Sequence, residues 1–297
     1  MKRIALKIDV DTYRGTLHGV PALIELLQRY DAGATFFLSL GPDQSGCETR
    51  TTSLSAYYDL TTRLYGRILP SPNIGIRCAD IMRQAESAGF EVGIHAWNRA
   101  RWDRHIQDAD NHWVEGEISK ARARFGELFA DAPLAHAAAG WRMNRHALRL
   151  TQRLGFSYAS DCRGFHPFIP VVDGELVACP QIPTTLPTLD ELLSLEPKYS
   201  VEQAVDRIAQ LSSAIAGDHV FTLRAELEGM KFAHAFERLL ATWSNDNHVL
   251  VPLRDLRATL DPAGLPRHTV SLAETPGRRG TRLTQGNAFL RSLGAAT

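Results

Sequence analysis

Residues 4–15 read IALKIDVDTYRG, a short apolar run that ends in two carboxylates and a turn. Side chains on a β-strand alternate between its two faces, so this run predicts that Asp9 and Asp11 point the same way. Two neighbouring carboxylates repel each other unless a cation lies between them or one of them keeps its proton. The pair is therefore either a general base beside a metal ligand or two solvated turn acids.

The composition is that of an ordinary folded protein, with 297 residues, 44% hydrophobic and 22% charged, and zero formal net charge. This balance gives no basic footprint for nucleic acid. The cysteines, at 47, 78, 162 and 179, have no CxxC spacing and indicate reduced thiols in a cytosolic protein. We expect no signal peptide, because charged residues interrupt the apolar N-terminal run, and no membrane span.

Apolar segments of strand length alternate with segments of helical period along most of the chain. The predicted strands after the first lie at 34–40, 90–95, 134–139, 156–160, 219–223 and 249–252, and the predicted helices at 18–30, 79–88, 111–129, 145–154, 201–215 and 232–243. Such alternation favours parallel strands with right-handed crossovers, and six or seven units favour a barrel. We expect an α/β fold, a distorted (β/α)7-type barrel over residues 1–260, with its chemistry at the strand ends.

Two segments interrupt this alternation. Residues 44–77 form an insertion after the second predicted strand, with an apolar and aromatic helical stripe flanked by arginines. This pattern fits either a helix that docks on a membrane surface or one that caps the domain's own core. Residues 261–297 are rich in Gly, Pro and Arg and have no period, so we expect an extended basic tail.

Polar residues collect where the predicted strands end: Asp9, Asp11, His95, Trp141, Arg142, Asp161, Arg163, Arg224 and Glu226. Long stretches around them resemble the polysaccharide deacetylase (NodB-like) superfamily and, within it, the deformylases of 4-deoxy-4-formamido-L-arabinose-phosphoundecaprenol. These stretches are IDVDTYRGT (8–16), GVPALIELL (19–27), GIHAW (93–97), AAAGWR (137–142), SDCRG (160–164), QIPTTLPTLDE (181–191) and AELEG (225–229). The resemblance runs almost from end to end.

The resemblance implies a hydrolase that removes a formyl or acetyl group from a sugar amine with one divalent metal (Zn, Co, Mn or Ni). Asp9 matches the general base, and Asp11 and His95 match two metal ligands. Arg142 matches an arginine that orients the base, and Asp161 matches the acid that tunes the general acid. In such a site the metal polarises the amide carbonyl and lowers the pKa of its water, while the base takes the proton.

The resemblance also implies the substrate and its place. The substrate is an aminoarabinose-like sugar on a polyprenyl phosphate, used in lipid A modification and polymyxin resistance. Such a substrate implies a cytoplasmic protein that is peripheral on the inner membrane. The residues assigned to substrate binding are Trp141, Arg163, Gln181, Glu226 and Arg99.

Two positions depart from the family pattern. Arg99 stands where the metal-binding segment has a second histidine, four residues after His95. Arg224 stands where the late strand ends in the general-acid histidine. A guanidinium offers no lone pair to a metal and stays charged at any accessible pH. Arg99 therefore cannot be a ligand, and Arg224 cannot serve as the acid.

Three accounts of these changes stay open. In the first, a rebuilt metal shell uses His105, His112 or water. In the second, the site holds no metal: Arg99 lies between the two first-strand aspartates, Arg224 pairs with Asp161, and the protein binds a lipid-linked sugar without catalysis. In the third, the two arginines read an anionic group of the substrate, a phosphate or carboxylate, in a changed reaction.

Overall fold

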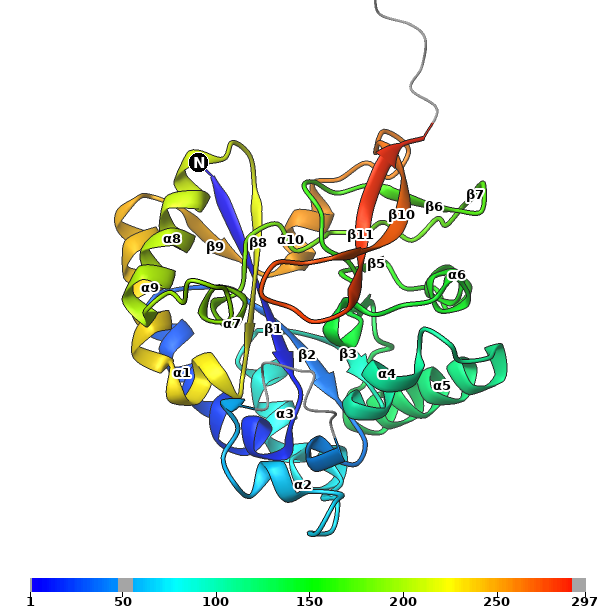
Figure 1. The fold of residues 1–297 in the computed structure, drawn as a ribbon. Coiled ribbons are helices and arrows are strands. Elements are labelled where there is room, and N and C mark those ends of the chain that lie inside the picture. Colours follow the sequence, from blue (N-terminus) through cyan, green and yellow to red (C-terminus); the bar gives the residue numbers. More distant parts are fainter. Residues whose placement is uncertain (1, 48–55, 290–297) are drawn as a thin grey trace, which may run out of the picture.

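A parallel sheet forms the centre of the fold (Figure 1). The computed structural model describes residues 2–47 and 56–289. The sheet runs in the order β5-β4-β3-β2-β1-β8, and β9 pairs with the start of β1. Its strands are β1 (Arg3–Val10), β2 (Thr35–Ser39), β3 (Glu91–Ala96), β4 (Ala135–His136), β5 (Tyr158–Ala159), β8 (His219–Arg224) and β9 (Val249–Val251). All its pairings are parallel, which confirms the α/β barrel-type fold.

Helices surround this sheet (Figure 1). They are α1 (Val20–Arg29), α2 (Ile74–Arg77), α3 (Ala79–Ser87), α4 (Arg99–His105), α5 (Asn111–Leu128), α6 (Arg145–Arg153), α7 (Leu189–Leu193), α8 (Val201–Ala214), α9 (Ala233–Asn245) and α10 (Leu253–Ala258). The helical periods predicted α1, α3, α5, α6, α8 and α9. They did not predict α4, whose sequence RARWDRH has no apolar stripe. No described helix is long and apolar enough to cross a membrane.

The two faces of β1 enter different cores. One face joins the large core under the helices through Ile4, Leu6, Ile8 and Val10. The other face carries Ala5, which packs in a smaller core inside the sheet. Because side chains alternate with period two, Lys7 and Asp9 share the inner face with Ala5. The interior of the sheet therefore becomes polar toward the carboxyl end of β1.

Residues 180–186 bridge the two ends of the sheet, β5 and β8. Ala159 donates its N–H to the carbonyl of Pro180 (2.8 Å), and Ile182 donates to the carbonyl of Ala159 (2.8 Å). Further on, Thr185 donates to the carbonyl of Val220 on β8 (3.1 Å). The motif QIPTTLPT thus takes the place of a strand that would close the barrel.

The C-terminal segment forms a hairpin, where the sequence predicted an extended tail. Its strands β10 (Arg267–Glu274) and β11 (Thr281–Ala288) pair antiparallel, and β10 also pairs with β6 (Ile169–Val172). A short strand, β7 (Glu175–Leu176), completes this second sheet. The loop between β10 and β11 passes over the centre of the molecule (Figure 1). Low periodicity hid this pairing, because β10 has no buried residue and the buried positions of β11 are mostly polar.

The described part of the predicted insertion lies at the carboxyl end of β1, in the lower part of Figure 1. Residues 48–55 are outside the described part of the chain. Residues 56–77 hold a 3-10 turn (Thr62–Leu64) and the short α2. The expected apolar stripe is therefore carried by turns in the described residues and not by one long helix.

Candidate active site at the strand ends

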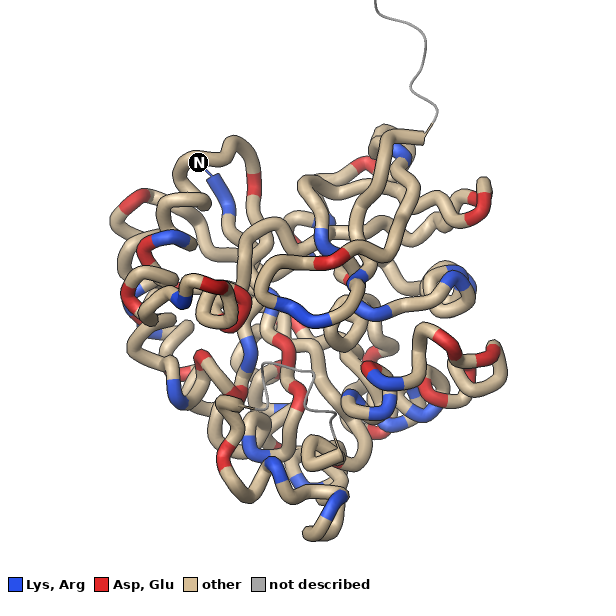
Figure 2. Tube along the Cα trace, viewed as in Figure 1, with Lys and Arg blue, Asp and Glu red and all other residues tan. Residues whose placement is uncertain are grey.

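The structure brings together five of the predicted residues at the carboxyl ends of β1, β3 and β8: Asp9, Asp11, His95, Arg99 and Arg224. Each of them is at most 4% exposed. Asp9 is aligned with Arg224 in the pairing of β1 with β8, and α4 begins at Arg99 just after β3. Acidic and basic positions mix near the centre of the molecule in Figure 2. Predicting that strand ends meet at one edge was sufficient to assemble this group.

Asp11 is surrounded by one imidazole and two guanidinium groups. His95 Nε2 lies 2.9 Å from Asp11 Oδ1, Arg224 Nε lies 3.4 Å from Oδ2, and Arg99 Nε lies 3.7 Å from the same oxygen. Burial by itself raises the pKa of Asp11, but Arg99, His95 and Arg224 together hold this pKa well below its usual value. Asp11 is therefore a charged carboxylate whose counterions are built into the chain.

Lys7 is a cation beside Asp9 that the sequence did not predict as a site residue. Lys7 Nζ lies 3.5 Å from Asp9 Oδ1 and donates to the carbonyl of Ser160 (3.1 Å). Arg224 Nη2 lies 3.9 Å from the other carboxylate oxygen of Asp9. Lys7 is fully buried, and burial lowers its pKa. The signal that locates it is the period of two, which puts Lys7 on the same face of β1 as Asp9.

The ring of Trp141 contacts four cationic side chains in and around the site. The cations of Lys7, Arg163, Arg224 and Arg278 lie 5.1, 5.2, 5.6 and 5.2 Å from its ring centroid. Such distances give favourable cation–π contacts, which are stronger away from water. Trp141 is 1% exposed, so its ring contacts the protein's own cations. The indole therefore orders the arginines of the site.

Asp190 and Arg278 are two further site residues that sequence reasoning missed. Asp190, on α7, lies 3.5 Å from Arg224 Nη1 and 2.7 Å from Arg278 Nη2. Burial raises the pKa of Asp190, but Arg278 and Arg224 outweigh it and lower this pKa overall. Arg278 comes from the β10–β11 loop and also contacts Glu191 (3.2 Å). Arg163 contacts the same Glu191 (3.3 Å). No local pattern predicts contacts between segments so distant in sequence.

Asp161 belongs to a separate, fully bonded group. Its Oδ1 lies 2.7 Å from His136 Nδ1 and accepts the N–H of Ala138 (2.8 Å). Its Oδ2 accepts from Gln181 Nε2 (3.2 Å). The ion pairs of Arg224 are with Asp9, Asp11 and Asp190. The Arg224–Asp161 pair expected for a metal-free site is therefore not formed.

Arg142 and the two spare histidines lie apart from the carboxylate pair. Arg142 Nε lies 3.1 Å from Asp103 Oδ1, and its Nη1 donates to the carbonyl of Asp103 (2.9 Å). Its described ion pair thus ties it to α4 and not to Asp9. His105 and His112 are exposed side chains. Among the described residues, neither histidine joins Asp11 and His95 in a group of metal ligands.

Glu226 and Glu228 accept hydrogen bonds from backbone N–H groups around the site. Glu226 Oε1 accepts the N–H groups of Asp11 (2.8 Å) and Thr12 (2.6 Å), and Glu228 Oε2 accepts the N–H of Arg224 (2.8 Å). Burial raises the pKa of each glutamate to about 8. Gly15 is required beside Glu226, since a Cβ at that position would lie 2.3 Å from Glu226 Oε1.

This donor set does not fit the divalent metal that the fold implies. Asp11 and His95 are two candidate ligands, but the third position is Arg99, which has no lone pair to give. Across the residues that the structure describes, no three His, Cys, Asp or Glu side chains gather as ligands of one ion. A metal would also face the guanidinium of Arg224 beside Asp11. The chemistry of this site is that of carboxylates and arginines.

Comparison with known proteins gives the lineage. Residues 2–159 match the family model described as polysaccharide deacetylase. A curated protein of Shewanella sediminis, named as the 4-deoxy-4-formamido-L-arabinose-phosphoundecaprenol deformylase ArnD, is 36% identical over 94% of this chain and 93% of its own. A protein of the same name from Wigglesworthia glossinidia brevipalpis is 30% identical over 90% of this chain and 96% of its own.

Solved structures share the fold. A polysaccharide deacetylase from Mycobacterium smegmatis has a TM-score of 0.65 at 17% identity, covering 92% of this chain and 96% of its own. A family 4 acetyl xylan esterase from Clostridium thermocellum, solved with a cobalt ion, has a TM-score of 0.53 at 14% identity, covering 90% and 97%. The chain therefore belongs to the polysaccharide deacetylase family, whose deformylases and deacetylases are hydrolases of carbon–nitrogen bonds other than peptide bonds.

Proposed function

We propose that this chain binds the substrate class for which its curated relatives are named, a 4-formamido-4-deoxyarabinose carried on a polyprenyl phosphate. The relatives match almost the whole chain, 94% and 90% of it. A pentose with an amide at C4 offers hydroxyl and amide groups, which buried carboxylates and arginines can bond.

We further propose that this chain binds the sugar without hydrolysing it at the rate of a metal-containing family member. The observation that carries this proposal is the pair of contacts from Arg224 (3.4 Å) and Arg99 (3.7 Å) to one oxygen of Asp11. Moving a buried arginine away from its carboxylate leaves an uncompensated charge, which costs about 3–5 kcal/mol. The arginines therefore stay in place of the metal, and Arg224, at the position of the acid histidine, stays charged and cannot serve as the acid.

The other residues predicted to bind substrate have framework roles in this proposal. Trp141, Arg163 and Gln181 bond or stack within the protein, against Arg224, Glu191 and Asp161 respectively. They position the arginines that meet the sugar. Asp9 and Arg224 are the groups that we expect to touch the formamide itself.

Metal-free hydrolysis is the second candidate function, and one observation favours it. Asp9 Oδ1 is buried, and Lys7 Nζ at 3.5 Å and His95 Nδ1 at 3.8 Å lie beside it, a polar setting in which a carboxylate can act as a general base. Arg224 would then stabilise the negative charge that develops on the amide oxygen. Water attack on the formamide would release formate and leave the free sugar amine.

One pair of assays separates the two candidates. Calorimetry with methyl 4-formamido-4-deoxy-arabinoside should show binding that Arg224→Met weakens by roughly tenfold, the worth of a charge-assisted hydrogen bond. Formate release from the lipid-linked sugar should stay at background in the wild type, and Asp9→Asn should not change it. Formate release that Asp9→Asn abolishes would establish the second candidate, and no binding of the glycoside would reject both.

We also propose that binding occurs at the cytoplasmic surface of the inner membrane. The described part of the insertion exposes Leu60, Ile68 and Ile76 by 65%, 72% and 58%. Exposed apolar groups beside a site for a lipid-linked ligand fit interfacial docking. Vesicle flotation tests this: Leu60→Ser with Ile68→Ser should release the protein, whereas Leu272→Ser, at a 49% exposed control position, should not. Equal flotation of both variants would contradict it.

A further inference from the structure

A cavity of about 410 Å³ lies beside the strand-end site, between the insertion and the turn after β8. Its lining includes Tyr57, Tyr58, Met230, Arg14, Lys231 and Glu226. The exposed surface of the walls is mainly apolar, and they carry two basic side chains, Arg14 and Lys231, and two acidic ones, Asp59 and Glu226. None of the five buried strand-end residues contributes to this lining. The cavity is therefore a neighbour of the site and not the site itself.

Glu226 connects the cavity to the site. Its Oε1 accepts the backbone N–H groups of Asp11 and Thr12, so one side chain separates the cavity from the Asp11 backbone. Its other oxygen, Oε2, is buried and has no hydrogen-bond partner in the part of the chain that the structure describes. A buried carboxyl oxygen without a partner is costly, which indicates a ligand that forms a hydrogen bond with it. A sugar hydroxyl, which can donate or accept, is such a group.

Lys231 supplies the charge at the outer part of the cavity. Arg14, the other basic residue there, pairs with Asp59. Lys231 has no carboxylate partner within residues 2–47 and 56–289. Its ammonium lies 5.5 Å from the ring centroid of Tyr57 and 5.6 Å from that of Phe232. An unneutralised cation above aromatic walls complements an anion attached to an apolar chain.

We propose that this cavity is a prenyl-phosphate subsite, in which Lys231 binds the phosphate and Tyr57 and Met230 contact the first isoprenoid unit. The proposal rests on the proposed function and locates the lipid end of the ligand. In a 4-formamido pentose with a phosphate on C1, the amide and the phosphate leave opposite ends of the ring. A ring hydroxyl then lies between them, where Glu226 separates the cavity from Asp11.

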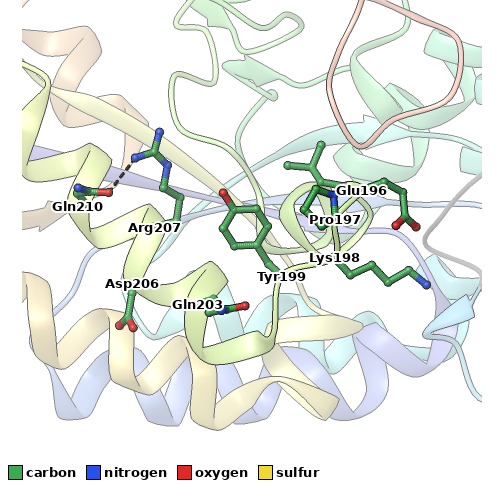
Figure 3. A pocket seen from close by; sticks show the side chains of 9 residues that line it. Glu196, Pro197, Lys198, Tyr199, Gln203, Asp206, Arg207 and Gln210 are labelled. Atoms are coloured by element: carbon green, nitrogen blue, oxygen red, sulfur yellow. Dashed lines mark hydrogen bonds between the residues drawn. The ribbon is translucent and has the colours of Figure 1, made fainter.

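A larger groove elsewhere on the molecule serves as a control. It has a volume of about 900 Å³ and is lined by α8 and the loop before it (Figure 3). Acidic and basic side chains alternate around it, among them Glu196, Lys198, Asp206 and Arg207. No strand-end residue reaches this groove. Lys198 is an exposed lysine like Lys231, so its removal changes the charge equally without touching the proposed subsite.

Calorimetry with farnesyl phosphate, kept below its micelle-forming concentration, tests the subsite directly. Farnesyl phosphate should bind at least about tenfold more tightly than inorganic phosphate or farnesol, because it alone offers both the charge and the apolar chain. Lys231→Ala should weaken that binding by about tenfold, and Lys198→Ala should leave it unchanged. Tyr57→Leu should weaken the binding of farnesyl phosphate and leave the binding of inorganic phosphate unchanged.

Two results would overturn the subsite: equal affinity for farnesyl phosphate and inorganic phosphate, or equal effects of the two lysine substitutions. The methyl glycoside keeps this outcome separate from the proposed function. Glycoside binding without selective farnesyl phosphate binding rejects the subsite alone. Selective farnesyl phosphate binding without glycoside binding supports the subsite and rejects the sugar site.

Discussion

Two buried histidine–carboxylate pairs lie in the same sheet, and they differ in how completely they are bonded. His136 and Asp161 are 2.7 Å apart, and both oxygens of Asp161 have further donors. His95 and Asp11 are 2.9 Å apart, yet no nitrogen of this histidine and no oxygen of this aspartate has a well-aligned hydrogen bond in the described residues. A saturated pair holds structure together, whereas a buried unsaturated pair is where a ligand is expected.

The change with the largest expected effect is the double substitution Arg99→His with Arg224→His. It would return two imidazoles to the unsaturated pair and remove both guanidinium groups from Asp11. Zinc-dependent formate release from the lipid-linked sugar should then rise by at least roughly 10²-fold over the wild type. Each single substitution should recover far less, because metal and acid act as a unit. A double variant as inactive as the wild type would show that the arginines are not what limits hydrolysis.

Breaking the saturated pair should lower stability strongly. Asp161→Ala leaves His136, Gln181 and the N–H of Ala138 buried without their acceptor. We expect the free energy of unfolding, measured by urea denaturation, to fall by about 3–4 kcal/mol. His95→Ala serves as the matched change in the unsaturated pair and should cost clearly less. Equal losses would remove the distinction between the two pairs.

Glu228, which accepts the backbone N–H of Arg224, should make the free energy of unfolding depend on pH. Burial raises the pKa of Glu228 to about 8 in the folded protein, above its unfolded value. Its contribution to stability is then complete below about pH 4.5 and is lost as the pH rises toward 8. Glu228→Gln should reduce the loss of unfolding free energy between pH 5 and 8 by on the order of 2 kcal/mol. The pKa of Glu226 is raised similarly, so in the Glu228→Gln variant Glu226 should still contribute part of the pH dependence of the unfolding free energy. An unchanged slope in urea titrations would contradict this assignment.

The smallest effect is expected outside both pairs. Arg3 Nη2 lies 2.6 Å from Asp218 Oδ2, and both side chains are partly exposed. Solvent and salt screen such a pair, so Arg3→Ala should lower the unfolding free energy by less than about 1 kcal/mol. Thermal unfolding of the wild type and of Arg3→Ala, at low and at high salt, checks this prediction. A loss as large as that of Asp161→Ala would mean that burial does not set the scale of these contacts.

The sequence predicted the parts of this site that follow from local periodicity. Alternation along β1 placed Asp9 and Asp11 on one face, and the strand-end rule added His95 and Arg224. Parallel pairing puts these ends at one edge of the sheet, so no knowledge of distant contacts was needed.

The residues that the sequence did not predict come from long-range packing. Arg278 reaches Asp190 only because the β10–β11 hairpin pairs with β6, and neither hairpin strand has a strong apolar pattern. The Arg142 contact with Asp103 depends on α4, whose helix has no apolar stripe. Local patterns report which residues are buried along one element, and they carry no information on which loop will cover it.

Calorimetric titration of zinc into chelator-stripped wild-type protein near pH 7 tests the central claim most directly. If Arg99 and Arg224 take the place of the metal at Asp11, the titration should show no stoichiometric binding. Tight one-to-one binding that is lost in Asp11→Ala and in His95→Ala would contradict the account. It would show that the carboxylate leaves its arginines for a metal.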